Sequence, residues 1–139
     1  MRQKIIIAVP TFFVIASIAS VFAQSNPPIA NQVEWDSPQT KELFYQTCAD
    51  CHSHETKWPW YASIAPISFP VLYHVAEGRE HFNISVPDMG EYYEAAEELE
   101  EGEMPESSYL WLHPEAKLSI KEKEALLQGL KKTFGEEEH

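Results

Sequence analysis

Two cysteines three positions apart, with a histidine directly after the second, form the stretch Cys48-Ala49-Asp50-Cys51-His52. This spacing is typical of a site where haem c is attached covalently. Two thiols about one helical turn apart can reach the two vinyl groups on one edge of a porphyrin, and the histidine can then bind the iron. The chain has no other cysteine. We therefore predict one covalent haem, with a thiol redox pair or half of a zinc site as the alternatives.

The ligand on the opposite face of the iron decides what a haem protein can do. Met104 precedes Pro105, and a residue before proline is kept away from helical geometry. We therefore predict that Met104 projects from a loop as the second iron ligand, which would raise the reduction potential relative to two imidazoles. The alternatives are Met89, an open face, or one of three histidines. These histidines are His74, His81 and His113.

A dense aromatic segment with several prolines follows the cysteine motif, and it is predicted to fold back as a loop. A porphyrin offers a flat apolar surface on which these side chains could pack, although ordinary core packing is also open. The candidates are Trp58, Trp60, Tyr61 and Pro66. The second ring nitrogen of His52 also needs a hydrogen-bond partner. We expect a backbone carbonyl of the loop around Ala65-Pro66 to supply it.

Helices are the elements that must position these groups. Ser37 suits the N-cap of a first helix and Pro38 its first position. The side chains that follow at spacings of three and four share one helical face, and this face carries both thiols. They are Leu43, Phe44, Thr47, Cys48 and Cys51. The haem is therefore expected to lie against the buried face of this helix.

Three further helices are predicted along the chain. The first starts at about Ser68 or Val71 and ends near Arg79, and the next runs from about Glu91 to Glu101, where Gly102 ends it. The last has a capping box of Ser119 and Glu122 and stops at Gly135. Its apolar face comprises Ile120, Leu126, Leu127, Leu130 and Phe134. No alternating run is long enough to predict a strand, so the fold class is all-α.

Residues 1–23 are predicted to direct export. Arg2 and Lys4 precede an apolar run from Ile5 to Phe22, and Val21-Phe22-Ala23 offers small residues before a cleavage site. An uncleaved membrane anchor is the alternative, because a span takes roughly 17–25 apolar residues. Both readings place the remainder outside the cytoplasm. We expect a periplasmic protein that is soluble or tethered to the inner membrane by residues 5–22.

The remainder is expected to form one domain, residues 37–135, after an extended linker at 24–36 and before an acidic tail at 136–139. The net charge is −12. This charge disfavours nucleic acid and anionic lipid as partners and suits a redox partner with a basic docking surface. Solubility alone would explain the charge as well. We expect a monomer that contacts a membrane only through its N-terminal segment.

Beyond the cysteine motif, the chain resembles the bacterial haem-binding domain family of small exported c-type cytochromes. The likeness spans roughly residues 26–130. It rests on Trp35-Asp36-Ser37-Pro38-Gln39-Thr40, Cys48-Ala49-Asp50-Cys51-His52-Ser53, Trp58-Pro59-Trp60-Tyr61, Ile64-Ala65-Pro66, His74-Val75, Glu77-Gly78-Arg79, Asn83, Met104-Pro105, Tyr109, His113-Pro114 and Leu118-Ser119. The chain departs from the expected pattern at Phe69 and Ile84, where relatives are expected to have Trp and Phe.

The resemblance implies a cytochrome c-like domain wrapped around one haem, with the first and last helices packed across each other. It implies thioether bonds at Cys48 and Cys51, with His52 and Met104 as the two iron ligands. The resulting hypothesis is an exported mono-haem electron carrier without catalytic residues of its own. The alternatives are a haem-based gas or redox sensor and a small peroxidase, which both need an open or displaceable ligand position.

Overall fold

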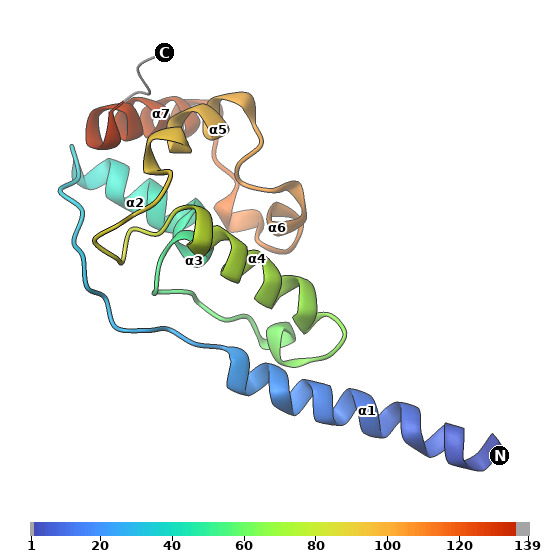
Figure 1. Ribbon diagram of the computed structural model, residues 1–139. Helices are drawn as coiled ribbons and strands as arrows, with labels where there is room; N and C mark the ends of the chain where they lie inside the picture. Colours follow the sequence, from blue (N-terminus) through green and yellow to red (C-terminus); the bar gives the residue numbers. More distant parts are fainter. Residues whose placement is uncertain (1, 136–139) are drawn as a thin grey trace.

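Helices form the framework of the protein, as Figure 1 shows. This computed structural model describes residues 2–135, with side chains described from residue 8 on, and no strand occurs in that range. The α-helices are α1 (Arg2–Ala23), α2 (Pro38–Thr47), α3 (Ala49–His52), α4 (Ser68–His81), α5 (Ala95–Glu101), α6 (Ser107–Leu112) and α7 (Ile120–Phe134). The 3-10 turns are η1 (Trp60–Ser63), η2 (Tyr92–Glu94) and η3 (Pro114–Ala116). The all-α prediction is confirmed; the predicted tail at 136–139 lies outside the described residues.

The start of α2 forms as its sequence predicts. The Ser37 side chain accepts a hydrogen bond from the Thr40 N–H at 3.1 Å, and Pro38 occupies the first helical turn. Leu43 and Phe44 are buried, as expected for the face that leads to the cysteines. The helical path breaks at Cys48 and resumes as the four-residue α3. The cysteine motif therefore lies at a bend rather than within one continuous helix.

Helices α2 and α7 pack directly across each other, as the sequence resemblance implies. A Cβ atom added at Gly129 would lie 2.1 Å from Thr40 Oγ1, so only glycine allows this approach. Leu126 and Leu130 of α7 are buried beside this contact. The prediction for Ile120 is wrong, because this side chain is 91% exposed. The buried face of α7 begins only at Leu126, one and a half turns after the helix start.

The middle of the chain follows the predicted outline, with one helix longer than predicted and one divided in two. Helix α4 begins at Ser68 and ends at His81, and the segment predicted as one helix from residue 91 divides into η2 and α5. Gly102 ends α5 with a left-handed conformation, φ 84°, as predicted. The six-residue α6 was not predicted, because so short a helix shows no clear hydrophobic period.

The linker is extended, as predicted, but it also joins the core. It passes along the domain between α1 and α2 (Figure 1). The N–H groups of Ala30 and Asn31 both donate to the Ser85 carbonyl. Trp35 packs on Phe44 with ring centroids 5.0 Å apart. The polar and aromatic groups of this segment therefore fix its path over the domain.

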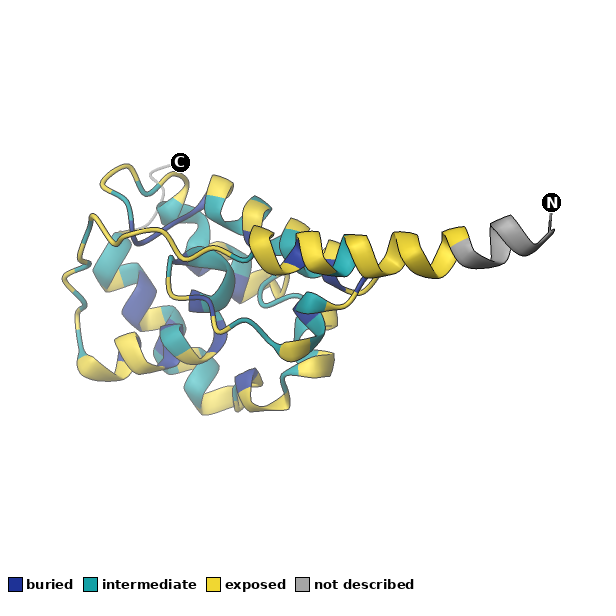
Figure 2. Cartoon of the chain, turned by 90° about the horizontal axis from the view of Figure 1, so that it is seen from below, coloured by how far each residue is buried: buried dark blue, intermediate teal, exposed yellow. Residues whose placement is uncertain are grey.

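Helix α1 extends away from the other helices and contacts the domain only near its C-terminal end (Figures 1 and 2). Most side chains described along it are exposed. Within the described part of the chain, no helix combines the length and apolarity that crossing a membrane requires.

Candidate functional site

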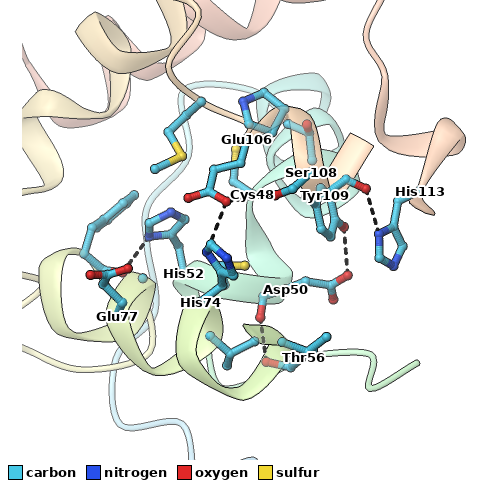
Figure 3. Close-up of a pocket in the computed structure, with 18 of the residues that line it drawn as sticks. Cys48, Asp50, His52, Thr56, His74, Glu77, Glu106, Ser108, Tyr109 and His113 are labelled. Atoms are coloured by element: carbon cyan, nitrogen blue, oxygen red, sulfur yellow. Dashed lines mark hydrogen bonds and ion pairs between the residues drawn. The ribbon is translucent and has the colours of Figure 1, made fainter. Parts of the chain in front are cut away.

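A cavity of about 570 Å³ lies among α3, α4 and the segment that leads from α5 to α6 (Figure 3). Its volume falls in the range of about 300–1,000 Å³ that is usual for sites of small molecules and cofactors. Five of the predicted site residues line it together: Cys48, Cys51, His52, Tyr61 and Met104. The cavity therefore joins the cysteine motif to a methionine more than fifty positions later in the chain.

The two cysteines are free, partly buried residues with neutral thiols. Neither forms a disulfide. Burial raises the pKa of Cys48 to about 12, and burial together with the nearby Asp50 raises the pKa of Cys51 to about 11. A thiol redox pair depends on thiolates, which this environment disfavours. The environment suits thiols that bind by forming carbon–sulfur bonds.

Close contact with α4 fixes the position of Cys51. A Cβ atom added at Gly78 would lie 2.9 Å from the Cys51 carbonyl oxygen and 3.0 Å from Cys51 Cβ. Glycine at this position lets the backbone of α4 lie directly against α3. One wall of the cavity is therefore set by contact between two backbones.

His52 is oriented by the end of α4. Its Nδ1 lies 2.9 Å from the Phe82 carbonyl oxygen, so the ring N–H donates there and Nε2 keeps its lone pair for a metal. Burial lowers the pKa of His52 and favours the neutral imidazole that binds iron. The prediction that the loop at Ala65-Pro66 supplies this carbonyl is wrong. The chain turns so that Phe82, at the C-cap of α4, reaches the ring first.

Met104 lies in the short loop that follows α5. The N–H groups of Gly102, Glu103 and Met104 all donate to the Glu98 carbonyl, at 3.1–3.2 Å, and so fold the loop back onto the helix end. The peptide bond from Met104 to Pro105 is cis. Glu106 then joins the loop to α4, since its Oε2 lies 3.1 Å from His74 Nδ1. The loop that carries the methionine is therefore held from both sides.

A polar network at another part of the cavity was not predicted. Tyr109 Oη donates to Asp50 Oδ2 at 2.9 Å, and Asp50 Oδ1 accepts from the Lys57 N–H at 2.9 Å. The Tyr109 ring stacks on His113 at 4.2 Å. Burial and the Asp50 carboxylate both raise the pKa of Tyr109. The only sign of this network in the sequence was the position of Asp50 between the two cysteines. Its hydrogen-bond partner Tyr109 lies 59 residues away.

The sequence profile of the haem-binding domain matches residues 11–132. The chain belongs to the haem-binding domain family. The match includes α2 to α6, α7 up to residue 132 and more than half of α1. No curated protein and no solved structure matches the chain. The cofactor of this family is haem, and the cavity has the size and the lining to accept one.

The residues that line the cavity of this haem-binding domain suit a haem. Two neutral thiols, an imidazole with one nitrogen open to a metal, and a neutral thioether all line one cavity. Thioether and imidazole are the iron ligands that proteins use for a haem with both faces occupied. No cluster of three or more His, Cys, Asp or Glu suited to a bare metal ion occurs among the described residues.

The other candidate iron ligands of the haem-binding domain have competing contacts. His113 Nε2 lies 3.2 Å from Tyr61 Oη and its Nδ1 lies 3.1 Å from the Tyr109 carbonyl, so both ring nitrogens are engaged. His81 Nδ1 contacts Glu91 at 3.0 Å, and the pKa of His81 is raised by that carboxylate. His74 contacts Glu106 through Nδ1. Met89 packs on the hydrophobic core and does not line the cavity.

Three of the predicted cofactor contacts, Trp58, Trp60 and Pro66, do not line the cavity. The Arg79 guanidinium lies over the Trp58 ring, 5.9 Å from the ring centroid. The Trp58 indole N–H donates to Asn26 Oδ1. Trp60 is 77% exposed on η1. Only Tyr61 of the aromatic segment turns toward the cavity. The prolines fold the segment as predicted, but most of its aromatic surface faces elsewhere.

Carboxylates surround the cavity of the haem-binding domain. Five glutamates line it: Glu77, Glu91, Glu94, Glu98 and Glu106. Lys57 is the single lysine or arginine among the described lining residues. The approach to the site is therefore negative, like the chain as a whole.

Proposed function

We propose that this haem protein is an exported c-type cytochrome that carries single electrons, with one haem attached through Cys48 and Cys51. The observation that carries the proposal is the hydrogen bond from His52 Nδ1 to the Phe82 carbonyl. It leaves Nε2 available in a cavity that both thiols and Met104 also line. This arrangement serves haem attachment better than thiolate chemistry, because desolvation favours the neutral form of both thiols.

Each residue has a defined part in this proposal. The thiols fix the cofactor permanently, so that it is not lost outside the cytoplasm. When bound, the haem supplies one-electron chemistry, since its iron alternates between the ferrous and ferric states. His52 and Met104 would bind the iron, and together they would exclude water and small ligands from it. The Phe82 carbonyl keeps the imidazole in one orientation during both oxidation states.

The proposed partner is a redox protein with a basic docking surface in the periplasm, and the proposed carrier is a monomer. The supporting observation is that five glutamates line the cavity in a chain of net charge −12. Complementary charge speeds the encounter of two redox proteins more than it strengthens their complex. Fast, weak contact suits a carrier that must leave after each transfer.

A peroxidase or sensor is the second candidate, and the contact between His74 and Glu106 favours it. Both residues line the cavity, and His74 Nδ1 lies 3.1 Å from Glu106 Oε2. A histidine oriented by a carboxylate can act as an acid and base on a ligand in an open position. This function requires that Met104 leave the iron or never bind it.

The optical spectrum of the purified protein, before and after acid–acetone extraction, tests the proposal. Haem that stays with the protein supports thioether attachment. The Cys48→Ala/Cys51→Ala double variant should release its haem on extraction, because neither carbon–sulfur bond can form, whereas Cys51→Ala alone keeps one bond and should retain haem with an altered spectrum. Haem that leaves the unaltered protein would refute covalent attachment. Rapid binding of carbon monoxide by the reduced protein would instead support the sensor or peroxidase.

A further inference from the structure

The C-terminal part of α1 forms hydrogen bonds with the haem-binding domain. Ser20 Oγ donates to Ser68 Oγ at 2.7 Å, and both side chains are buried. Ser17 Oγ accepts from the Ala65 N–H at 3.0 Å. The polar side chains of the last two turns of α1 thus meet the start of α4 and the turn before it. A segment that serves only for export needs an apolar composition but no specific hydrogen bonds to the domain.

These contacts continue across the bond where cleavage would fall. The Gln24 N–H donates to the Ser20 carbonyl at 3.2 Å, so the helical hydrogen bonding extends past Ala23. Gln24 Nε2 then donates to Ser63 Oγ of η1 at 2.9 Å. Cleavage after Ala23 would separate Ser17 and Ser20 from the partners that they contact. It would also uncover Ser68, which is completely buried.

The family match gives independent support. It begins at residue 11, well inside α1, and continues without a break to residue 132. A segment that is removed after export needs an apolar composition but no fixed sequence relation to the domain. Inclusion of this part of α1 in the domain profile indicates that it belongs to the domain.

The outward side of α1 is apolar and uncovered. No charged residue occurs from Ile5 to Ala23. The exposed large apolar side chains along it are Val9, Phe12, Phe13, Val14, Ile15, Ile18, Val21 and Phe22. Figure 2 shows exposed residues along most of the described part of this helix, from residue 8 on. The elements that α1 touches add exposed Trp60, Ile64 and Phe69. So large an apolar surface marks a binding face.

We propose that α1 is retained after export and holds the haem-binding domain against a lipid surface, with its serines on the domain and its apolar side chains in lipid. The chemistry of the exposed side favours lipid over a second copy of the chain. A partner helix from a second copy would cover only one face of α1, whereas the exposed apolar side chains lie around most of α1. Two copies would also bring together two domains that each carry strong negative charge. The proposal does not depend on how the haem iron is ligated.

The mass of the intact protein, expressed as the full chain and extracted with detergent, tests retention. A mass that includes residues 1–23 supports the proposal. A protein that begins at Gln24 overturns it.

Flotation with phosphatidylcholine vesicles tests the lipid surface, using two exposed isoleucines as a matched pair. Ile15 on α1 is 62% exposed, and Ile120 at the start of α7 is 91% exposed. The Ile15→Glu variant should bind vesicles about tenfold less, because a carboxylate is costly to place in lipid. The Ile120→Glu variant should bind as the unaltered protein does. Equal binding by both variants, or an unaltered chain that stays in solution as a dimer, overturns the proposal.

A double-mutant cycle tests the docking of α1. Ser20→Ala and Ser68→Ala remove the two hydroxyls that meet at 2.7 Å. If the helix is docked in the detergent-extracted protein, the effects of the two substitutions on the thermal midpoint should not add. Additive effects would show that the hydroxyls do not meet, and this would overturn the docked arrangement.

Discussion

The imidazole of His52 depends on a residue that lies thirty positions away in the sequence. The Phe82 carbonyl orients its ring, and Phe82 reaches it because Gly78 allows α4 to approach Cys51. A ring held by a backbone carbonyl stays neutral and keeps one nitrogen directed at a metal. The properties of the iron are then set by the group on its other face, and Met104 is our proposal for that group.

Replacement of Met104 tests this assignment directly. Met104→Leu keeps the apolar bulk but removes the sulfur, so the variant should lose the weak sulfur–iron band of the ferric spectrum. The reduced variant should bind carbon monoxide at least about tenfold faster, because the position is then open. The reduction potential should also change.

Met89→Leu is the matched control, since Met89 packs on the core outside the cavity. Its spectrum and its carbon monoxide binding should equal those of the unaltered protein. If instead Met89→Leu alters the spectrum and Met104→Leu does not, the ligand assignment is wrong.

The sequence predicts which residues form the site better than it predicts the hydrogen-bond partners that orient them. Cys48, Cys51 and His52 form one local motif, and their chemistry is visible from spacing alone. The carbonyl of Phe82 could not be predicted, because every residue carries a carbonyl and only tertiary structure selects one. Trp58 and Trp60 have the composition of a cofactor-packing segment, but side-chain direction in a proline-rich loop does not follow from composition.

Helix ends are the feature of the elements that the sequence predicts best, because a cap is a contact among neighbours in the chain. The Ser37 cap and the capping box at Ser119 form as expected. The burial of α7 was predicted less well, since the crossing point with α2 decides which turns are covered. The contact of α1 with α4 joins segments 48 positions apart and left no local signal.

The capping box of α7 should give the domain a defined acid dependence. Hydrogen bonds from the Ser119 side chain and N–H lower the pKa of Glu122. A lowered pKa in the folded state contributes stability above the ordinary pKa, and this contribution disappears as the pH falls through the lowered value. Ser119→Ala should reduce the thermal midpoint by about 5 °C at pH 7 and by less at pH 3.

Gln128→Ala, a substitution on the exposed face of the same helix, serves as the control for the cap. Its midpoint should remain close to that of the unaltered protein at both pH values. An equal loss for Ser119→Ala at pH 7 and pH 3 would contradict the role of the Glu122 carboxylate.

The crossing of α2 and α7 should be sensitive to one methyl group. Gly129→Ala would place Cβ 2.1 Å from Thr40 Oγ1, so the helices must separate. We expect a loss of about 2 kcal/mol in the free energy of unfolding, typical of overpacking in a core. Denaturant unfolding measures it. Thr40→Ala in the same chain should restore part of the loss, and an unchanged stability for Gly129→Ala would contradict the close approach.

On the scale of the whole molecule, charge and apolar surface occupy different regions. Five glutamates line the cavity, whereas the exposed apolar side chains of α1 lie along a helix that extends beyond the domain (Figures 1 and 2). A domain held at lipid through α1 would keep the cavity accessible to a partner from the aqueous side. The two surfaces therefore suit one arrangement, in which a tethered carrier meets mobile, basic redox partners.

Charge reversal at the cavity separates local attraction from net charge. Glu94 lines the cavity, whereas Glu124 is exposed on α7 and does not. Glu94→Lys and Glu124→Lys change the net charge equally. The rate of electron exchange with a cationic redox reagent, measured by stopped flow at low salt, should fall about tenfold for Glu94→Lys. The fall should be much smaller for Glu124→Lys, and raising the ionic strength should remove the difference. Equal rates for the two variants at low salt would show that electrons do not enter beside the glutamates of the cavity, and the docking surface would have to lie elsewhere.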